Sequence, residues 1–392
     1  MVHLSDFRFD SRIQRQATAL AERGDTVDLV CLGQPDELRV GDGLIRINPI
    51  AGTKPSGGVR GYLGGYARFL AAAARRLTAL ERRSRFDLVE VHNMPDALTL
   101  TASLPRLRGA PVILNLHDTF PELFASKFDR PYDGREVRLL ELEERFSARL
   151  ADALITVTDE ARQRLRERGV GTGRIFVVMN SPDERTFGPP RDAIAIPAQG
   201  ELRVIYHGGL ARRFGVETLI RAFARLRPEV SRVSVRVCGD GEDLPMLRAL
   251  AAEFGNDRID VAGPVPFETI PSELRAAHIG AVPTLHDRFT ELLLPVKLLE
   301  YVHMGLPVVA SRLPGITRYF SADEVRLFAP GDPDALAAAI ADVCADPEAA
   351  RERARRATDR LQTIAWESQR RHYLEIVDQL VSNGRASRHQ EL

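Results

Sequence analysis

Short apolar runs rich in β-branched residues alternate with stretches of helical periodicity along nearly the whole chain. This alternation predicts parallel β-strands, each followed by a helix that covers the sheet. The strands expected in the first half are residues 2–5, 26–33, 44–49, 87–92, 111–118, 153–158 and 174–180. Those expected in the second half are residues 202–209, 234–241, 259–263, 279–283, 307–311 and 325–330.

A long helix is expected over residues 62–83, which carry arginines on one face. The apolar positions at helical spacing are Tyr62, Tyr66, Phe69, Leu70, Ala73, Leu77 and Leu80. Residues 181–201 contain four prolines and two glycines and interrupt the alternation. The pattern therefore predicts α/β architecture: two Rossmann-like, doubly wound parallel-sheet domains facing a central cleft, with ligands beyond the carboxyl ends of the strands.

The expected domains are residues 1–183 and 202–363, joined by a linker over 184–201 and followed by a C-terminal helix and tail over 364–392. A length of 392 residues suits two domains, and 44% apolar with 28% charged residues is typical of a soluble globular protein. Lys plus Arg and Asp plus Glu each number 54, so no overall positive charge argues for nucleic acid as a partner.

Three cysteines, Cys31, Cys238 and Cys344, lack the spacing of a metal site, and we expect them to be reduced and buried. The chain opens without a signal-peptide pattern, and no apolar run approaches the roughly 18 residues of a membrane span. We therefore expect a cytoplasmic protein that is soluble or at most attached to a membrane surface.

The segment LPVKLLEYVHMGLPVVAS, residues 294–311, predicts a short helix, a glycine stop and a buried strand. Pro295 suits the first helical position and Gly305 the left-handed stop. Lys297 and Glu300 share a helix face, where a lysine beside the helix start suits a diphosphate and a carboxylate one turn later can accept ribose hydroxyls. The alternative is a solvent-exposed ion pair without a ligand.

Glycine-rich turns follow two of the predicted strands in the second half. Gly208 and Gly209 let the backbone approach a ligand, and Arg212 or Arg213 can reach a phosphate, although a turn with solvated arginines is also common. Gly239 lies in an isolated G-x-G turn, which is a weak signal because it lacks the third glycine of a dinucleotide fingerprint.

Polar residues also follow strands of the first half. His117 and Asp118 end one strand, and either line a ligand site or close a loop as a polar pair. The neighbouring strand ends in His92 and Asn93, which suit acceptor hydroxyls. Asp10 and Arg12 lie on the first loop and are expected to face the same cleft.

Several of these segments together resemble glycosyltransferase family 4, whose members are retaining enzymes of GT-B architecture that use nucleotide-diphospho-sugars. The matching segments are VILNLHDTFPE, VVMNSPD, YHGGLARRFG, CGDGEDLPMLRALAAEFG and ELLLPVKLLEYVHMGLPVVAS. They occur in the family's order over most of the chain, and the last is the most specific. The first strand looks short for the family.

The resemblance assigns roles to individual residues. Glu300 matches the second glutamate of the E-x7-E signature, which is expected to bind the donor ribose. Leu292 stands where the first glutamate is expected, so either the adjacent Glu291 contacts the donor sugar or that role is lost. Arg213 matches a diphosphate-binding arginine of one branch, because Gly209 and Phe214 replace the more usual arginine and lysine.

The remaining donor-site residues also follow from the resemblance. His117 corresponds to the histidine over the donor sugar, and His117, Arg213 and Lys297 are the expected catalytic residues. The other expected donor-binding residues are Gly208, Gly209, Gly239, Val265, Leu293, Leu294 and Pro295. Residues 364–392 would return to the N-terminal domain, as the family's terminal helix does.

The resemblance implies a hexosyltransferase with a UDP-sugar as the expected donor, without cofactor or metal. The acceptor would be a saccharide or lipid-linked saccharide in cell-surface polysaccharide or glycolipid synthesis. The only D-x-D, Asp332 to Asp334, is more simply a helix N-cap. Two alternatives stay open: a nucleotide-sugar epimerase of the same architecture and a non-catalytic nucleotide-binding protein.

A peripheral contact with anionic membrane is a further possibility for a lipid-linked acceptor. The predicted helix over 62–83 carries Arg68, Arg75, Arg76, Arg82 and Arg83. Cations on a helix face can bind anionic lipid. A simply solvated helix face explains the same residues.

Overall fold

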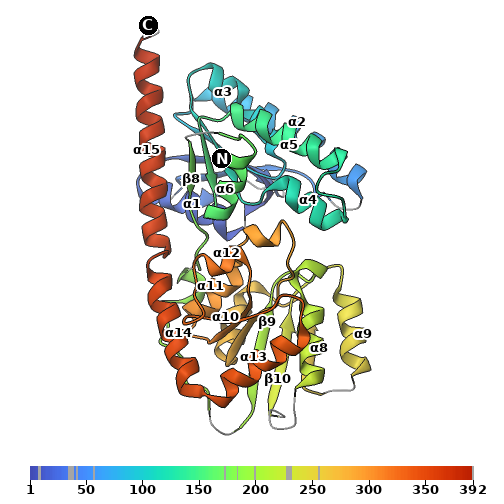
Figure 1. Ribbon diagram of the computed structural model, residues 1–392. Coiled ribbons are helices and arrows are strands. Elements are labelled where there is room, and N and C mark those ends of the chain that lie inside the picture. Colours follow the sequence, from blue (N-terminus) through green and yellow to red (C-terminus); the bar gives the residue numbers. More distant parts are fainter. Residues whose placement is uncertain are drawn as a thin grey trace. The chain divides into compact units, whose positions relative to one another are not determined.

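The computed structural model describes residues 1–7, 10–33, 39–40, 43–55, 58–171, 174–182, 184–197, 200–226, 232–254 and 257–390 (Figure 1). The chain divides into two compact units. Unit 1 comprises Met1–Asn180 and Glu367–Leu392, and unit 2 comprises Ser181–Trp366. Within the described parts of the chain, no helix is both long and apolar enough to cross a membrane.

Unit 1 contains an eight-stranded sheet in the order β3-β4-β2-β1-β5-β6-β7-β8, parallel except for the β3–β4 pair. Its strands are β1 (Val2–Asp6), β2 (Val27–Leu32), β3 (Arg39–Val40), β4 (Ile45–Ile50), β5 (Val89–His92), β6 (Val112–Leu116), β7 (Ala153–Thr156) and β8 (Ile175–Val177). Its helices are α1 (Ser11–Glu22), α2 (Val59–Arg83), the 3-10 helix η2 (Asp96–Ala102), α3 (Ser103–Leu107), α4 (Phe120–Phe128), α5 (Arg135–Arg149), α6 (Asp159–Glu167) and α15 (Trp366–Gln390).

The C-terminal helix α15 packs on unit 1, although it is the last element of the chain. The Tyr373 hydroxyl donates a hydrogen bond of 2.6 Å to Glu90, which lies on β5. Gln369 of α15 accepts from the Met179 backbone, and His372 contacts the Phe176 ring of β8. Tyr373 itself is completely buried, so α15 contributes a side chain to the interior of this unit.

Unit 2 contains a six-stranded, fully parallel sheet in the order β11-β10-β9-β12-β13-β14. Its strands are β9 (Leu202–His207), β10 (Val233–Cys238), β11 (Ile259–Gly263), β12 (Ile279–Val282), β13 (Val308–Ser311) and β14 (Arg326–Phe328). Its helices are α7 (Glu184–Phe187), η3 (Arg212–Phe214), α8 (Val216–Arg225), α9 (Leu244–Glu253), η5 (Phe267–Thr269), α10 (Ile270–Arg275), η6 (Thr290–Leu292), α11 (Val296–His303), α12 (Pro314–Thr317), α13 (Pro333–Ala345) and α14 (Pro347–Gln362).

Among the parallel strands, the strand order of each sheet reverses at one point. In unit 1 the reversal lies between β1 and β5, and in unit 2 it lies between β9 and β12. At such a point the helices that follow the two neighbouring strands lie on opposite faces of the sheet. A crevice therefore forms beyond the carboxyl ends of these strands, where α/β proteins bind ligands. Each unit therefore has one preferred location for a site.

The strands and the Rossmann-like class predicted from the sequence are confirmed in both units. The two-residue strand β3 was not predicted. Residues 188–197 of the expected linker lie on unit 2, where Arg191 and Ile194 donate backbone hydrogen bonds to His303 and Gly305. Asp332 caps α13 as predicted, because its carboxylate accepts from the backbone of Asp334 and Ala335.

Candidate active site

The predicted helix of residues 294–311 is α11, which begins one residue later than expected. Pro295 is its N-cap rather than its first helical residue, and Gly305 ends it with a φ of 72° as predicted. The Lys297 amine donates a hydrogen bond of 2.7 Å to the Tyr206 hydroxyl at the end of β9. Glu300 Oε2 lies 3.0 Å from Nε2 of His207, the next residue of the same strand. Both charged residues of α11 thus contact the end of β9, at the reversal point.

The ring of Phe214 brings two cations of unit 2 together. The Arg213 guanidinium lies 4.9 Å and the Lys297 amine 5.2 Å from its centre, and Lys297 also lies 3.8 Å from the Tyr206 ring centre. Burial lowers the Lys297 pKa to about 7, against the opposing effect of Glu300. Arg213 Nε is buried without a hydrogen-bond partner among the described residues. The two basic side chains therefore lie close together, and Arg213 keeps a hydrogen-bond donor for a ligand.

Glycines bring the backbone loops of unit 2 close to this site. Gly208 has a φ of 115°, and a Cβ there would lie 3.1 Å from the Lys297 amine. A Cβ at Gly239 would lie 1.9 Å from the Gly208 carbonyl oxygen. A side chain at Gly239 would overlap the backbone, and one at Gly208 would be strained and would crowd Lys297. Glycine at both positions therefore lets the loops after β9 and β10 pack closely and keeps the main chain of Gly208 next to Lys297.

The other donor-binding residues predicted in unit 2 lie on two further loops. Glu291 is in η6, with Oε2 3.5 Å from His286 Nε2, whereas the adjacent Leu292 is buried. Leu293, Leu294 and Pro295 lead from η6 into α11. Val265 is half-buried in the loop after β11. Donor contacts of these residues, including Glu291 in place of the missing glutamate, stay a prediction.

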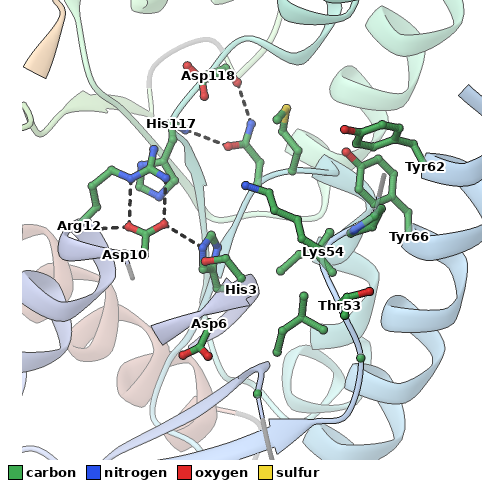
Figure 2. A pocket seen from close by; sticks show the side chains of 18 residues that line it. His3, Asp6, Asp10, Arg12, Thr53, Lys54, Tyr62, Tyr66, His117 and Asp118 are labelled. Atoms are coloured by element: carbon green, nitrogen blue, oxygen red, sulfur yellow. Dashed lines mark hydrogen bonds and ion pairs between the residues drawn. The ribbon is translucent and has the colours of Figure 1, made fainter. Parts of the chain in front are cut away.

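A pocket of about 570 Å³ lies in unit 1 at the reversal point between β1 and β5 (Figure 2). Predicted residues Asp10, Arg12, Asn93, His117 and Asp118 all line it. The lining also includes residues that sequence reasoning did not assign to a site: His3, Asp6, Thr53, Lys54, Tyr62 and Tyr66.

Asp10 organises one wall of this pocket. It caps α1 and pairs with Arg12 through two hydrogen bonds of 3.1 and 2.9 Å. His3 Nε2 lies 3.0 Å from the same carboxylate. Burial opposes ionisation of Asp10, but the contacts with His3 and Arg12 outweigh it and hold its pKa below the usual range. Asp10 therefore stays a carboxylate that fixes both side chains.

Asn93 and His117 form the adjoining wall. The Asn93 side chain accepts from the His117 backbone N–H at 3.0 Å and donates to the Asp118 carbonyl at 2.7 Å, which ties the ends of β5 and β6 together. His117 Nε2 lies 3.0 Å from Nδ1 of His92. His92 is completely buried and does not line the pocket, so the expectation that it faces acceptor hydroxyls is wrong.

Several functional contacts could not be read from the sequence. Tyr206 contacts Lys297, and His207 contacts Glu300. Both residues come directly before the glycine pair in a segment that the sequence had already marked. Their position at the end of a predicted strand was the one signal that could have assigned them to the site. Tyr62 and Tyr66 were counted only among the apolar positions of α2. Tyr66 does pack against the core of unit 1, but both side chains also line the pocket.

Two family models match the chain. Residues 10–181 match the Glycosyl transferase 4-like domain, and residues 201–346 match Glycosyl transferases group 1. Among curated proteins, the chain is 26% identical over 352 residues to the 2-deoxystreptamine glucosyltransferase of Streptomyces kanamyceticus, covering 86% of this chain and 89% of that relative.

Solved structures show the same fold at low sequence identity. Sucrose-phosphate synthase from Thermosynechococcus elongatus is 20% identical with a TM-score of 0.77, over 95% of this chain and 93% of that one. Anabaena HepE in complex with UDP-glucose is 17% identical with a TM-score of 0.70, over 96% of this chain and 99% of that one. The two family models and the glycosyltransferase relatives agree with the family named from the sequence. This chain is a glycosyltransferase of GT-B fold and belongs to the group 1 glycosyl transferases of family 4.

Proposed function

We propose that this enzyme transfers a sugar from a nucleotide-diphospho-sugar to an acceptor hydroxyl, with retention of configuration at the anomeric carbon. The observation that carries the proposal is the pair of cations, Arg213 and Lys297, on the single ring of Phe214, with Glu300 one helical turn further on. Two cations suit a diphosphate and a carboxylate suits a ribose. The complex of Anabaena HepE with UDP-glucose supports a UDP-sugar as the donor.

The cations would act on the leaving group. Cleavage of the bond between the anomeric carbon and the phosphate oxygen leaves positive charge on the sugar ring and an additional negative charge on the diphosphate. Fixed positive groups that contact this developing charge lower the barrier. The acceptor oxygen forms its new bond on the face that the diphosphate leaves, and a phosphate oxygen takes the acceptor proton. Because Arg213 and Lys297 supply the charge, the proposal requires neither a metal ion nor a cofactor.

The pocket of unit 1 would hold the acceptor. Tyr62 and Tyr66 offer aromatic faces to a saccharide ring, while Asp118 and the ammonium of Lys54 offer polar contacts to its hydroxyls. This composition fits a saccharide or lipid-linked saccharide, as in the synthesis of cell-surface polysaccharide or glycolipid.

Thermal stabilisation by UDP-, GDP-, ADP- and dTDP-glucose tests the donor site, because a ligand that binds only the folded protein raises Tm. We expect at least one to raise Tm, and Lys297→Met and Glu300→Gln to abolish the shift. Lys127→Met is the matched control, since Lys127 also donates a 2.7 Å hydrogen bond to a tyrosine hydroxyl, that of Tyr62. Equal shifts in all three variants would contradict the donor site.

The stereochemistry has its own test. Glycosyltransferases release free sugar slowly when water replaces the acceptor, and proton NMR identifies the anomer formed first. The α-anomer from an α-linked donor supports retention. The β-anomer as the first product would refute it.

We also propose that unit 1 contacts an anionic membrane surface. Exposed Arg60, Arg68, Arg75 and Arg82 recur about every seven residues on one face of α2. Leu139, Leu142 and Phe146, which are 66%, 56% and 50% exposed, form an apolar stripe on α5, and both helices pack against η2. Cations and exposed apolar side chains on the same unit are the combination that can bind anionic bilayers.

Vesicle flotation tests this contact. Binding to phosphatidylglycerol vesicles but not to phosphatidylcholine vesicles, with loss in high salt, is expected. Arg68→Glu with Arg75→Glu, or Phe146→Ser, should weaken it. The double variant Arg351→Glu with Arg371→Glu makes the same charge change at exposed positions elsewhere and should still bind. Absence of salt-sensitive binding would refute the membrane contact.

A further inference from the structure

A line of buried polar side chains runs from α15 to the pocket of unit 1. Tyr373 donates to Glu90 Oε2 at 2.6 Å, and Asn115 donates to the other carboxylate oxygen, Oε1. His92 Nε2 lies 3.7 Å from Glu90 Oε1, and His92 Nδ1 lies 3.0 Å from His117 Nε2. All but His117 are at most 2% exposed.

The two histidines are neutral at physiological pH. Burial holds the pKa of His92 well below its usual value, and the neighbouring His117 lowers it further. Burial likewise lowers the pKa of His117, followed by the charge of Arg12. A neutral imidazole carries a proton on only one ring nitrogen. The hydrogen bond between the rings therefore has one donor and one acceptor.

The position of Glu90 determines which of the two histidine rings donates the hydrogen bond between them. Its Oε1 accepts from Asn115, so it presents a lone pair whether the carboxyl is ionised or protonated on Oε2. A nitrogen lone pair facing this oxygen would be repelled, whereas an N–H is attracted. His92 consequently carries its proton on Nε2, and its Nδ1 accepts from His117 Nε2. The lone pair of His117 is then on Nδ1.

We propose that Glu90, fixed by Tyr373 of α15, sets the tautomer of His117 through His92, so that His117 presents Nδ1 to the pocket ligand as a hydrogen-bond acceptor. His117 would then accept from a substrate hydroxyl, a role that rests on the proposed function. Glu90, His92 and Tyr373 are positioning residues, since none of them lines the pocket. The tautomer itself is independent of any substrate.

Nitrogen-15 NMR of the histidine rings distinguishes the tautomers in the ligand-free protein. We expect both His92 and His117 to be protonated at Nε2 only. His278 serves as an internal reference, because its Nδ1 accepts from the Arg203 backbone at 3.0 Å and lies far along the chain in unit 2. A proton on Nδ1 of His117, or an imidazolium at pH 7, would overturn the proposal without touching the assignment of the donor site.

Two variants test the role of Glu90. Glu90→Gln keeps an oxygen for Asn115, so the His117 tautomer should persist and kcat should stay within about threefold. Glu90→Met removes the acceptor, so His117 should show a mixture of tautomers and kcat should fall about tenfold, with the donor KM nearly unchanged. An unchanged tautomer in Glu90→Met would overturn the proposal. If that variant does not fold, the wild-type and Glu90→Gln spectra still decide.

Discussion

Burial destabilises the charged form of the Lys297 amine, and a bound anion would stabilise it again. Burial lowers its pKa to about 7, so the free enzyme holds the charge only part of the time at neutral pH. The Tyr206 hydroxyl and two aromatic rings hold the amine in place. An anionic ligand would stabilise the ammonium form, which couples binding to proton uptake.

This coupling predicts a pH-dependent donor affinity. Deprotonation removes the cation, so affinity is highest below the pKa and falls as the pH rises through 7. With the pKa at about 7, Kd of a nucleotide sugar should rise about tenfold between pH 6 and pH 8. Calorimetry in two buffers should detect proton uptake. Lys297→Arg, which stays charged, should bind almost equally at both pH values. An equally flat profile for the wild type would contradict the role of Lys297.

Gly208 offers a second test at the scale of single residues. Gly208→Ala introduces a methyl group 3.1 Å from the Lys297 amine at a φ of 115°. Gly200→Ala is the matched control, because its φ is 90° and no atom lies within 4 Å. Both variants should lose on the order of 1–2 kcal/mol of unfolding free energy through backbone strain.

Only Gly208→Ala should also weaken donor binding, by about tenfold or more, since it displaces the amine. Calorimetric titration of both variants with the same nucleotide sugar provides the comparison. Equal donor affinity in the two variants would show that Gly208 does not shape the site.

At the scale of elements, η2, α4, α5 and α6 enclose a cluster of carboxylates beside Asn93. Arg168 pairs with Glu122 at 2.6 Å and with Glu144 at 2.7 Å. Burial raises the pKa of Asp96 to about 6, and burial together with Asp96 raises that of Glu143 to about 8. Arg164 also lies 3.5 Å from Glu122, so two arginines face the four carboxyl groups of Asp96, Glu122, Glu143 and Glu144 and cannot neutralise them all.

These raised pKa values predict how stability depends on pH. The folded state holds protons on Glu143 between its ordinary pKa and about 8, so unfolding free energy falls as the pH rises through this range. Glu143→Gln should therefore stabilise the protein by on the order of 1–2 kcal/mol at pH 9 and much less at pH 5. Urea unfolding at both pH values measures this difference.

Glu167→Gln on the exposed side of α6 is the control and should change neither value. A stabilisation by Glu143→Gln that is the same at pH 5 and pH 9 would show that its ionisation is not the cause.

The elements themselves were largely predictable, because buried parallel strands are continuous apolar runs and α11 has clear start and stop signals. The strand β3 was missed, since two residues carry no periodicity. The partners of the site residues were also missed. Tyr206 precedes Lys297 by 91 positions, and only the crossover between β9 and α11 brings them together.

At the scale of the whole molecule, the chain assembles two sheets and then returns to the first. The last helix brings Tyr373 to Glu90, which lies 283 positions earlier. No local sequence pattern predicts such a contact, because the two residues meet only when the helix packs on the folded unit. The family resemblance, rather than periodicity, indicated that the terminal helix would return.

The most direct test of the account is calorimetric titration of the wild type and Lys297→Met with UDP-, GDP-, ADP- and dTDP-glucose. The account predicts that the wild type binds at least one of them and that Lys297→Met binds it at least about 100-fold more weakly, as expected for loss of a buried charge-assisted contact. Binding of equal strength by both proteins would contradict it.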